Sequence, residues 1–377
     1  MSKIIIVGDL FPTKANIDLF SNGDIHSLFG NKIVRLFSDA DLRICNLEGA
    51  LSDGKEKCEK TGPVITAPVK AIKAYKELGI DYCMLANNHI TDAGHQGVLD
   101  TIESLDKVGI RHVGAGINES SIPHYVIHTL EDKKICIYNV CERMYNKPDG
   151  KKAGAWLYDE YVVCKELECL KQQSDYLIVI YHGGIEKFRY PSPEIKKRFH
   201  RMADSGADFV LSQHTHCIGC EEYYNGSYLL YGQGDFLLKN FRPEITDKGF
   251  IVELDIDSNG QTIKKHIVEC SKDLHLSYLD TPDYTDFNKR SSMIQDDEFL
   301  NNEFKTFCKK ELLLYLTAFK SPGKMMRFVR RFFPGPYKKW LFHNAFSRRN
   351  LLFTLHTLRS EQNRETAIVG LEDLLNI

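Results

Sequence analysis

Five short apolar runs, far apart in the sequence, each lead directly into side chains that can bind a metal ion. The first run is Ile4–Val7, and a later one is Tyr82–Leu85. A single polar residue in such a place is usually a cap or a turn former. Open α/β sheets, however, bind their ligands at the carboxyl ends of strands. The residues that follow the five runs are Asp9; Glu48; Asn88 with His89; His182; and His214 with His216. Five such strand ends in one chain predict a shared site.

The stretch Leu85–Gly94 can be interpreted either as an ordinary turn or as part of the shared site. It follows the apolar run Tyr82–Leu85, turns sharply and enters a helix. Taken alone, its Asn and Asp side chains could satisfy backbone groups of a turn. The other four strand ends favour the site.

Strands alternate with helices in the first 120 residues. One helix is predicted over about residues 69–78, followed by Gly79, and another over about 97–108, followed by Gly109. Glycine after the last helical turn can adopt the left-handed backbone conformation. Strand, helix and strand with short connections are typical of βαβ units in a mostly parallel sheet.

The second half is richer in strands. A hairpin is predicted over residues 125–138, with its turn at Glu131 and Asp132. A further helix is predicted over about residues 194–205 and ends at Gly206.

The bulk composition is that of an ordinary globular protein. The 377 residues suffice for one large domain with an appendage, or for two domains, and 43% of them are apolar. A net charge of −2 implies no general attraction to nucleic acid, and we expect none as a partner.

The sequence predicts a cytoplasmic protein. The first apolar run is too short for a signal peptide or a membrane span. The cysteines number 11 and have no framework spacing, which fits reduced thiols. Cys217 and Cys220 form a lone Cys-x-x-Cys pair, which we interpret as structural rather than as a zinc site.

Carboxylate, amide and imidazole groups, with no required thiolate, suit Zn²⁺, Mn²⁺ or Fe better than Ca²⁺. His214 and His216 are two residues apart. On a loop, each imidazole could face one of a pair of metal ions.

These motifs resemble the bacterial CapA-type (poly-γ-glutamate capsule synthesis) family, a branch of the calcineurin-like metallophosphoesterases. The resemblance covers about residues 1–270 and implies an α/β fold, a four-layer αββα sandwich with a dinuclear metal centre at the strand ends. The motifs that carry it are Gly8-Asp9; Asn46-Leu47-Glu48; Ala86-Asn87-Asn88-His89 with Asp92 and Gly94; His182-Gly183-Gly184-Ile185-Glu186; Pro191-Ser192-Pro193; Gly206-Ala207-Asp208; His214-Thr215-His216; and Tyr231-Gly232-Gln233-Gly234-Asp235-Phe236.

The resemblance implies a role for each residue. Two divalent ions, Mn²⁺, Fe or Zn²⁺, would be the cofactors. Asp9 and His216 would bind the first metal, Glu48 would bridge, and Asn88, His182 and His214 would bind the second. His89 would act beside the scissile group and be oriented by Asp92.

Departures from the family pattern concern the first metal and the last motif. Phe11 stands where the wider superfamily has a histidine, so the first site is expected to be weak. Glu48 stands where the superfamily has Asp. Gln233 and Asp235 replace an apolar residue and Asn, which we interpret as tuning of the site.

Arg189 and Glu186 are candidates for substrate binding. Arg189 could clamp an anionic substrate or be an ordinary surface arginine. We interpret Glu186 as a partner that supports His182 rather than as a metal ligand.

Two functions remain open from the sequence. One is a metal-dependent hydrolase of phosphoesters in capsule or envelope polymer metabolism. The other is a non-catalytic component of polymer synthesis and export, which would use the metal site to bind an anionic chain.

The remainder of the chain is predicted as a linker over residues 271–297 and a helical extension over 298–377. Residues 321–350 contain eight Lys or Arg, interleaved with aromatic residues, and no acidic residue. This pattern suits peripheral contact with the inner face of an anionic membrane, or with a polyanionic product. The alternative is a helical cap that packs on the main domain.

Overall fold

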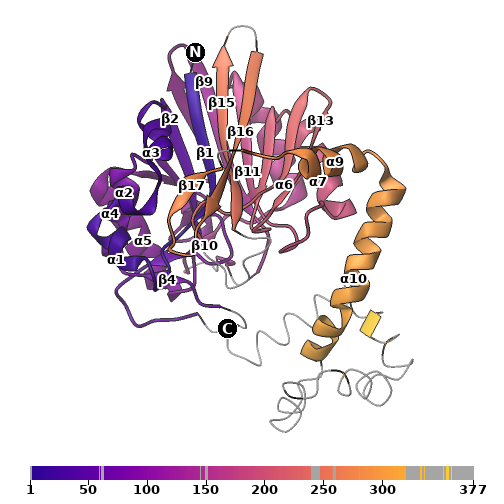
Figure 1. The fold of residues 1–377 in the computed structure, drawn as a ribbon, viewed down its shortest axis with the longest axis horizontal. Coiled ribbons are helices and arrows are strands. Elements are labelled where there is room, and N and C mark those ends of the chain that lie inside the picture. The colour runs from indigo at the N-terminus through magenta and orange to yellow at the C-terminus, as the bar shows by residue number, and fades with distance from the viewer. Residues whose placement is uncertain are drawn as a thin grey trace. The chain divides into compact units, whose positions relative to one another are not determined.

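The computed structural model describes residues 2–58, 60, 63–144, 146–148, 152–238, 247–257, 260–279 and 281–319, and six single residues beyond them (Figure 1). The chain divides into two compact units, Met1–Asn302 and Glu303–Ile377. The first unit contains both large sheets and every predicted site residue. Residues 321–350, predicted to contact a membrane or a polymer, lie almost entirely outside the described residues.

The first sheet has seven strands. In spatial order they are β17 (Leu276–Tyr278), β16 (Gly260–Cys270), β15 (Lys248–Asp257), β1 (Ser2–Leu10), β2 (Leu42–Leu47), β5 (Tyr82–Met84) and β6 (Arg111–Val113). Strands β1, β2, β5 and β6 of this sheet are parallel to one another, as the βαβ pattern predicted. The other three strands extend the sheet in antiparallel fashion beside β1.

The second sheet has six strands. In spatial order they are β13 (Ile218–Tyr224), β14 (Ser227–Gln233), β12 (Phe209–Gln213), β11 (Tyr176–His182), β9 (Lys133–Cys141) and β8 (Tyr125–Leu130). Its four central strands are parallel, and β8 and β13 pair antiparallel at the two edges. The hairpin predicted over residues 125–138 is confirmed as β8 and β9, with Glu131 of its turn at a φ of 53°.

Two further pairs of short strands are separate from the two large sheets. They are β3 (Ala50–Leu51) with β4 (Thr66–Ala67), and β7 (Ala115–Gly116) with β10 (Gly154–Ala155).

Helices cover the outer faces of both sheets. Against the first sheet lie α1 (Ile17–Asn22), α2 (Ile25–Leu28), α3 (Asn31–Ser38), α4 (Ile72–Glu77) and α5 (Gly94–Val108). Against the second lie α6 (Glu160–Lys171) and α7 (Pro193–Asp204). Two 3₁₀ turns span Val69–Ala71 and Glu119–Ser121. The helix predicted over residues 97–108 is confirmed as α5, and Gly109 after it has a φ of 75°.

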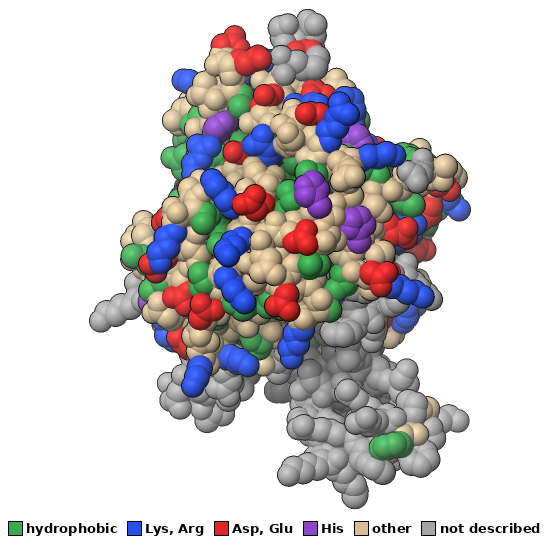
Figure 2. All heavy atoms as spheres, turned by 60° about the vertical axis from the view of Figure 1, so that its left-hand side comes forward, with side chains coloured by type: hydrophobic (Ala, Val, Ile, Leu, Met, Phe, Trp, Pro, Cys, Tyr) green, Lys and Arg blue, Asp and Glu red, His purple; other side chains and the backbone are tan. Residues whose placement is uncertain are grey.

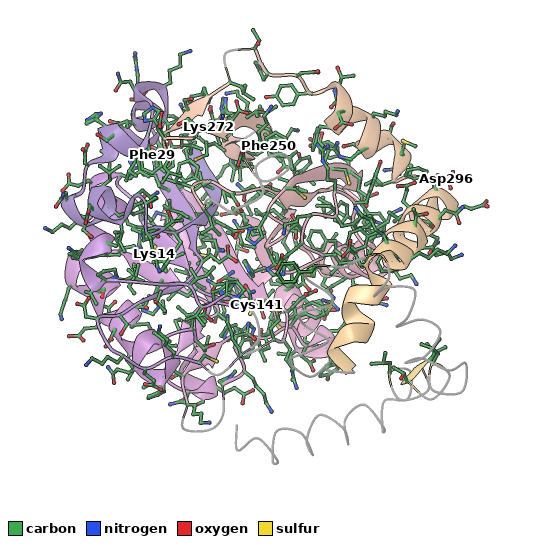
Figure 3. The ribbon with its side chains drawn as sticks, turned by 60° about the horizontal axis from the view of Figure 1, so that its bottom comes forward. Lys14, Phe29, Cys141, Phe250, Lys272 and Asp296 are labelled. Carbon is green, nitrogen blue, oxygen red and sulfur yellow. The ribbon has the colours of Figure 1, made fainter. Side chains whose placement is uncertain are left out.

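The apolar runs build three cores because neighbouring side chains of a strand point to opposite faces. In β1, Ile4 and Ile6 enter the core between the two sheets, while Ile5 and Val7 enter the core under the helices. Figure 3 shows side chains filling the space between the ribbons, with Phe250 of β15 labelled. The predicted four-layer αββα sandwich is therefore confirmed.

Replacing Ile178 of β11 by alanine is expected to lower the free energy of unfolding by about 2–5 kcal/mol. The Ile178 side chain is fully buried between the sheets, so its loss leaves a cavity there. Urea denaturation of the wild type and the variant measures the difference. Val162→Ala, on the exposed side of α6, is the control and should change the free energy by less than about 0.5 kcal/mol.

The segment 271–297, predicted as a linker, contributes structure to the first unit. Part of it pairs with β16 as β17, and α9 (Thr285–Met293) packs against β13. In α9, Phe287 and Arg290 are buried, and the Arg290 Nε donates a hydrogen bond to the Gly219 carbonyl oxygen at 2.8 Å. The polar composition of the segment gave no indication that these few residues are buried. The next helix, α10 (Asp297–Phe319), begins directly afterwards.

Within the described residues, no helix is long and apolar enough to cross a bilayer. Figure 2 shows basic and acidic side chains interspersed over the face in view, in line with the net charge of −2.

Candidate metal centre

The predicted metal ligands all lie at the carboxyl ends of strands, and they come from both large sheets. Asp9 is near the end of β1, and Glu48 directly follows β2. His182 is the last residue of β11, and His214 directly follows β12. Cys141 ends the neighbouring β9 opposite His182 and is labelled in Figure 3, which brings this end of the strands forward. The edge between the two sheets therefore gathers residues from positions 9 to 216.

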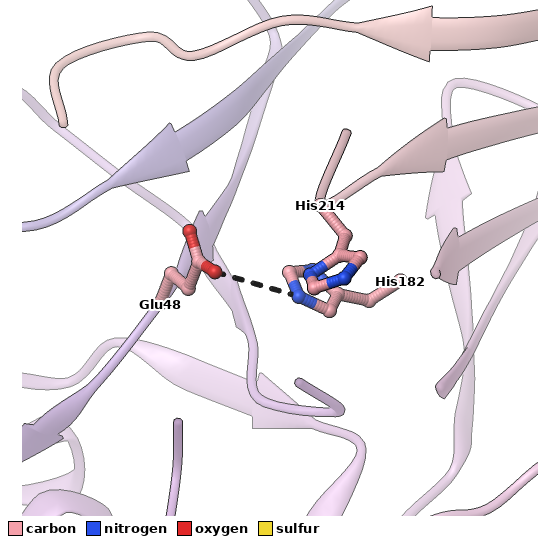
Figure 4. Close-up of side chains that lie close together, drawn as sticks. All are labelled: Glu48, His182 and His214. Atoms are coloured by element: carbon pink, nitrogen blue, oxygen red, sulfur yellow. Dashed lines mark ion pairs between the residues drawn. The ribbon is translucent and has the colours of Figure 1, made fainter. Parts of the chain in front are cut away.

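Glu48 belongs to two groups of possible ligands. The first group contains Glu48, His182 and His214, and the second contains Asp9, Glu48 and His216. Within each group the ligand atoms lie within 4.8 Å of one another, and all five residues are buried. Figure 4 shows Glu48 pointing toward the two imidazoles of the first group, with its Oε1 3.6 Å from His182 Nε2. The position of Glu48 suits a carboxylate shared between two cations.

Asn88 lies within reach of the first group. Its Oδ1 is 2.9 Å from His182 Nε2, and its side chain is buried. The imidazole rings of His182 and His214 are 4.9 Å apart between centroids. Four of the predicted ligands, one carboxylate, one amide and two imidazoles, thus face the same small volume.

Hydrogen bonds hold Asp9 in place on the other side. The Asn46 Nδ2 donates to Asp9 Oδ1 at 2.6 Å, and the backbone N–H of His214 donates to Oδ2 at 3.3 Å. Asn87 in turn donates to Asn46 Oδ1 at 3.2 Å. This chain of amides orients the Asp9 carboxylate toward the cluster. The sequence motif contained Asn46, but no role was predicted for it.

Several buried polar atoms of the cluster have no hydrogen-bond partner among the described residues. They are Glu48 Oε1, Glu48 Oε2, His214 Nδ1 and Asp235 Oδ2. A buried polar group without a partner is costly, and two nearby buried carboxylates without a cation are more so. Divalent cations would satisfy these atoms, since carboxylate and imidazole are ligands of Zn²⁺, Mn²⁺ and Fe. The residues present therefore fit a metal centre.

The pKa shifts follow from burial and from the neighbouring charges. Burial and the Asp9 carboxylate raise the pKa of Glu48 well above its usual range. Burial lowers the pKa of His182 well below its usual range, and burial together with His216 lowers the pKa of His214 to about 4. Two of the imidazoles are therefore neutral near pH 7, which is the form that binds metal.

Asp9 and His216 shift the other way because they form an attractive pair. Burial would raise the pKa of Asp9, but the hydrogen bond and charge of His216, together with the hydrogen bond from Asn46, lower it. Burial would likewise lower the pKa of His216, but Asp235 and Glu48 raise it well above its usual range. Burial raises the pKa of Asp235 itself to about 6.

The loop that carries His214 and His216 has an unusual backbone. His214 has a φ of 89° and His216 a φ of 53°, both in the left-handed region that non-glycine residues rarely adopt. Such strain persists where the surroundings hold it, and it is concentrated at functional sites. The two turns direct both imidazoles into the cluster from one short loop.

The predicted pair His89 and Asp92 lies beside the cluster. The His89 Nδ1 is 2.7 Å from Asp92 Oδ2, and Asp92 is fully buried. Asp92 Oδ2 also accepts the backbone N–H of Ile65 at 2.6 Å, and the His89 backbone N–H donates to Asn87 Oδ1 at 3.1 Å. These bonds fix the imidazole in one orientation.

Comparison with known proteins agrees with this geometry. The family described as "Bacterial capsule synthesis protein PGA_cap" matches residues 3–240. The chain belongs to this family. Its match covers both groups of possible ligands and ends shortly after β14.

Curated relatives carry capsule and polymer names. The chain is 26% identical over 205 residues to "Capsule biosynthesis protein CapA" of Bacillus anthracis, covering 53% of this chain and 50% of that protein. It is 28% identical over 214 residues to "Probable polyglutamine synthesis accessory protein" of Mycobacterium tuberculosis, covering 52% and 55%. The chain spans about half the length of the curated relatives it matches.

Two solved structures are similar at low identity. A hypothetical protein of Thermus thermophilus is 16% identical, with a TM-score of 0.45, and the match covers 71% of this chain and 99% of that one. A 5'-nucleotidase precursor of the same organism is 12% identical, with a TM-score of 0.41, and the match covers 83% and 59%.

In this PGA_cap member, Phe11 is a core residue. It is fully buried, and its ring lies against Gly49, where a Cβ would come within 2.6 Å of the ring. Phe11 offers no ligand atom, so the group of Asp9, Glu48 and His216 has three side chains, whereas Asn88 adds a fourth to the group of Glu48, His182 and His214.

Arg189 and Glu186 are placed differently from the ligands. Arg189 donates through Nε to the Ile218 carbonyl oxygen at 3.1 Å and pairs with Asp286 of α9 at 2.8 Å. Glu186 is half-exposed and lies 3.8 Å from Lys187 Nζ, yet its charge counters the lowering of the His214 pKa. The contacts of Arg189 thus tie β13 to α9, and substrate binding by either residue stays a prediction.

Cys217 and Cys220 are both buried, and burial raises the pKa of Cys217 to about 11. Neither cysteine is in the possible metal groups formed by the described residues.

Sequence reasoning missed Lys60. Its side chain is almost fully buried, forms an ion pair with Asp92 and places Nζ 3.1 Å from His89 Nδ1. Lys60 lies in an irregular segment with no hydrophobic period or strand end. In the sequence, Lys60 is simply a lysine among polar residues, and such a lysine is more often exposed to solvent.

Replacing Lys60 by methionine is expected to lower the free energy of unfolding by about 3–5 kcal/mol, because it leaves a buried carboxylate without its cation. Chemical denaturation monitored by circular dichroism measures the effect. Lys57→Met, at an exposed position of the same segment, is the matched control and should stay within about 0.5 kcal/mol of the wild type. Equal free energies of unfolding of the two variants would show that the ion pair between Lys60 and Asp92 does not stabilise the fold.

Proposed function

We propose that the chain is a metal-dependent hydrolase of phosphoesters that acts in the biosynthesis of a capsule or envelope polymer. One observation carries the proposal: two groups of buried ligands share Glu48, whose carboxylate oxygens have no hydrogen-bond partner among the described residues. The oriented His89–Asp92 pair lies next to these groups. Family membership and the names of the relatives support the polymer context.

The ligands divide between two cations. Asp9 and His216 would hold the first, Asn88, His182 and His214 the second, and Glu48 would contact both. Bound divalent ions such as Mn²⁺, Fe or Zn²⁺ supply Lewis acidity and a water-derived nucleophile at neutral pH. Burial of all these side chains excludes bulk water and strengthens their electrostatic interactions.

His89 would be the proton donor. Asp92 accepts the hydrogen of His89 Nδ1, so Nε2 is the nitrogen that can give a proton to a leaving oxygen. Lys60 holds the Asp92 carboxylate from its other oxygen and keeps the pair aligned. The leaving oxygen of a phosphoester is the atom that needs this proton.

The decisive experiment measures metal and turnover on the purified chain. Elemental analysis is expected to find a divalent transition metal, and an aryl phosphate diester with Mn²⁺ is expected to be hydrolysed. A chain that binds no divalent cation would refute the metal centre. A chain that binds cations and hydrolyses no phosphoester would refute the hydrolase.

The second candidate is a non-catalytic component that binds an anionic polymer through its metal site. The burial of Phe11 in place of a ligand favours it, because one metal position then has fewer donors. Metal binding without turnover, together with retention of poly-γ-glutamate on the metal-loaded chain, would support this candidate. A cytoplasmic site of action, at the inner face of the membrane, is part of both proposals.

A further inference from the structure

Asp235 is a buried carboxylate beside the candidate metal centre that the proposed ligand sets do not use. It directly follows Gly234, and only 4% of its surface is exposed. The backbone N–H groups of Phe236 and Leu237 both donate to the Asp9 carbonyl oxygen at 3.0 Å. The Asp235 backbone is therefore anchored to the end of β1, next to a proposed ligand.

The Asp235 side chain contacts His216. Its Oδ1 lies 2.7 Å from His216 Nδ1, and its Oδ2 has no hydrogen-bond partner among the described residues. The other imidazole nitrogen, His216 Nε2, is 3.9 Å from Glu48 Oε1. His216 Nδ1 thus faces Asp235 at 2.7 Å, with Asp9 Oδ2 farther away at 3.4 Å, and Nε2 faces the shared carboxylate.

We propose that Asp235 is the positioning residue of His216. It accepts the Nδ1 hydrogen and would present Nε2 to the cation that Asp9, Glu48 and His216 would hold. A histidine that donates its second ring hydrogen to a carboxylate is fixed in tautomer and orientation and becomes a more basic ligand. This inference rests on the proposed metal centre and deepens it.

The loop geometry explains why His216 needs this support. Its backbone lies in the left-handed region, with a φ of 53°, so the backbone alone does not favour this conformation. Phe11 provides no ligand to the group of Asp9, Glu48 and His216. Metal binding by this group therefore depends more strongly on a correctly oriented His216. Asp235 also adds a third carboxylate to Asp9 and Glu48, which favours a divalent cation at this position.

The test titrates the metal-free protein with Mn²⁺ alone and measures stoichiometry and affinity by isothermal titration calorimetry. Asp235→Ala is expected to weaken one of the two Mn²⁺ sites by about 10–100-fold, as loss of a carboxylate behind a metal-bound histidine does. Asp235→Asn keeps an oxygen that can accept the Nδ1 hydrogen, so it should weaken that site less. The second Mn²⁺, at His182 and His214, should bind as in the wild type.

A matched control removes the same interaction elsewhere. Glu222 is buried and accepts from His200 Nε2 at 2.8 Å, and neither residue is in the metal groups. Glu222→Gln should bind Mn²⁺ like the wild type. Circular dichroism of every variant establishes that it is folded.

The results separate this inference from the proposed function. Wild-type protein that binds no Mn²⁺ would overturn the metal centre and this role with it. Wild-type binding of two Mn²⁺, with unchanged affinities in Asp235→Ala, would overturn only the role of Asp235. An equal loss in the Asn and Ala variants would also overturn it, because Asn keeps the acceptor, and so would an equal weakening of both sites.

Discussion

Replacing His182 and His214 together by alanine is expected to abolish binding of the second divalent cation and phosphoesterase activity at the same time. Both imidazoles are buried, and with Glu48 they form one of the two groups of converging ligand atoms. Removing them leaves Asn88 and Glu48 as the remaining proposed donors for the second cation. Two protein donors are too few for a stable transition-metal site, which usually takes three or four.

Loss of the second cation should also end turnover. Phosphoester hydrolysis at a two-metal site needs both ions to hold the attacking and leaving oxygens. Elemental analysis of the purified variant and hydrolysis of an aryl phosphate diester with Mn²⁺ measure the two losses on one sample. Unchanged metal stoichiometry in the double variant would contradict the assignment of these histidines.

A matched double variant controls for the loss of two imidazoles. His200 and His266 each pair with a glutamate at 2.8 Å, away from the metal groups. His200→Ala combined with His266→Ala should keep metal content and turnover, with some loss of stability. Loss of metal in this control would mean that metal retention reflects general stability rather than ligation.

The sequence predicted where the candidate ligands would lie because of how parallel strands are arranged. Such strands all end at the same edge of a sheet, so a polar residue directly after an apolar run has a known position. Asp9 and Glu48 needed only this rule to be placed at one edge, because β1 and β2 are parallel neighbours in one sheet, whereas His182 ends a strand of the other sheet. The four-layer architecture came from the family resemblance, since local patterns do not say how two sheets pack.

The sequence could not predict contacts made by residues without such a position. Lys60 lies in an irregular segment, so nothing in the sequence indicates that its side chain approaches Asp92. His216 just precedes β13 and Asp235 just follows β14, and the register that pairs Ile218 with Gln233 brings them together. The pairing of β1 with β15 is of the same kind, since Ile6 lies opposite Val252.

The composition of a segment does not indicate its structure when a few buried residues hold it on the domain. Asp, Asn, Ser and Thr dominate residues 271–297, which predicted a linker. Two buried side chains of α9, Phe287 and Arg290, are enough to fix that helix on the domain. Arg189 belongs to the same arrangement, because its charge faces Asp286.

Replacing His89 by asparagine is expected to lower kcat by about 10²–10⁴-fold while metal content stays at the wild-type value. His89 belongs to neither of the metal-ligand groups found among the described residues, and its Nδ1 is engaged with Asp92 at 2.7 Å. Its loss should therefore remove proton donation and leave the ligands in place. Asp92→Asn should give a smaller loss, since the imidazole stays but is no longer held in the same tautomer.

The leaving group distinguishes proton donation from a merely structural role of His89. An aryl leaving group is a weak base and departs without much help, whereas an alkyl alkoxide needs a proton in the transition state. The His89→Asn variant should thus lose much more activity on a dialkyl phosphate diester, whose leaving group is an alkoxide, than on a diaryl diester. Comparison of kcat/KM for the two esters measures this ratio. Equal losses on both would mean that His89 shapes the site but donates no proton, because a misplaced substrate would slow both reactions alike.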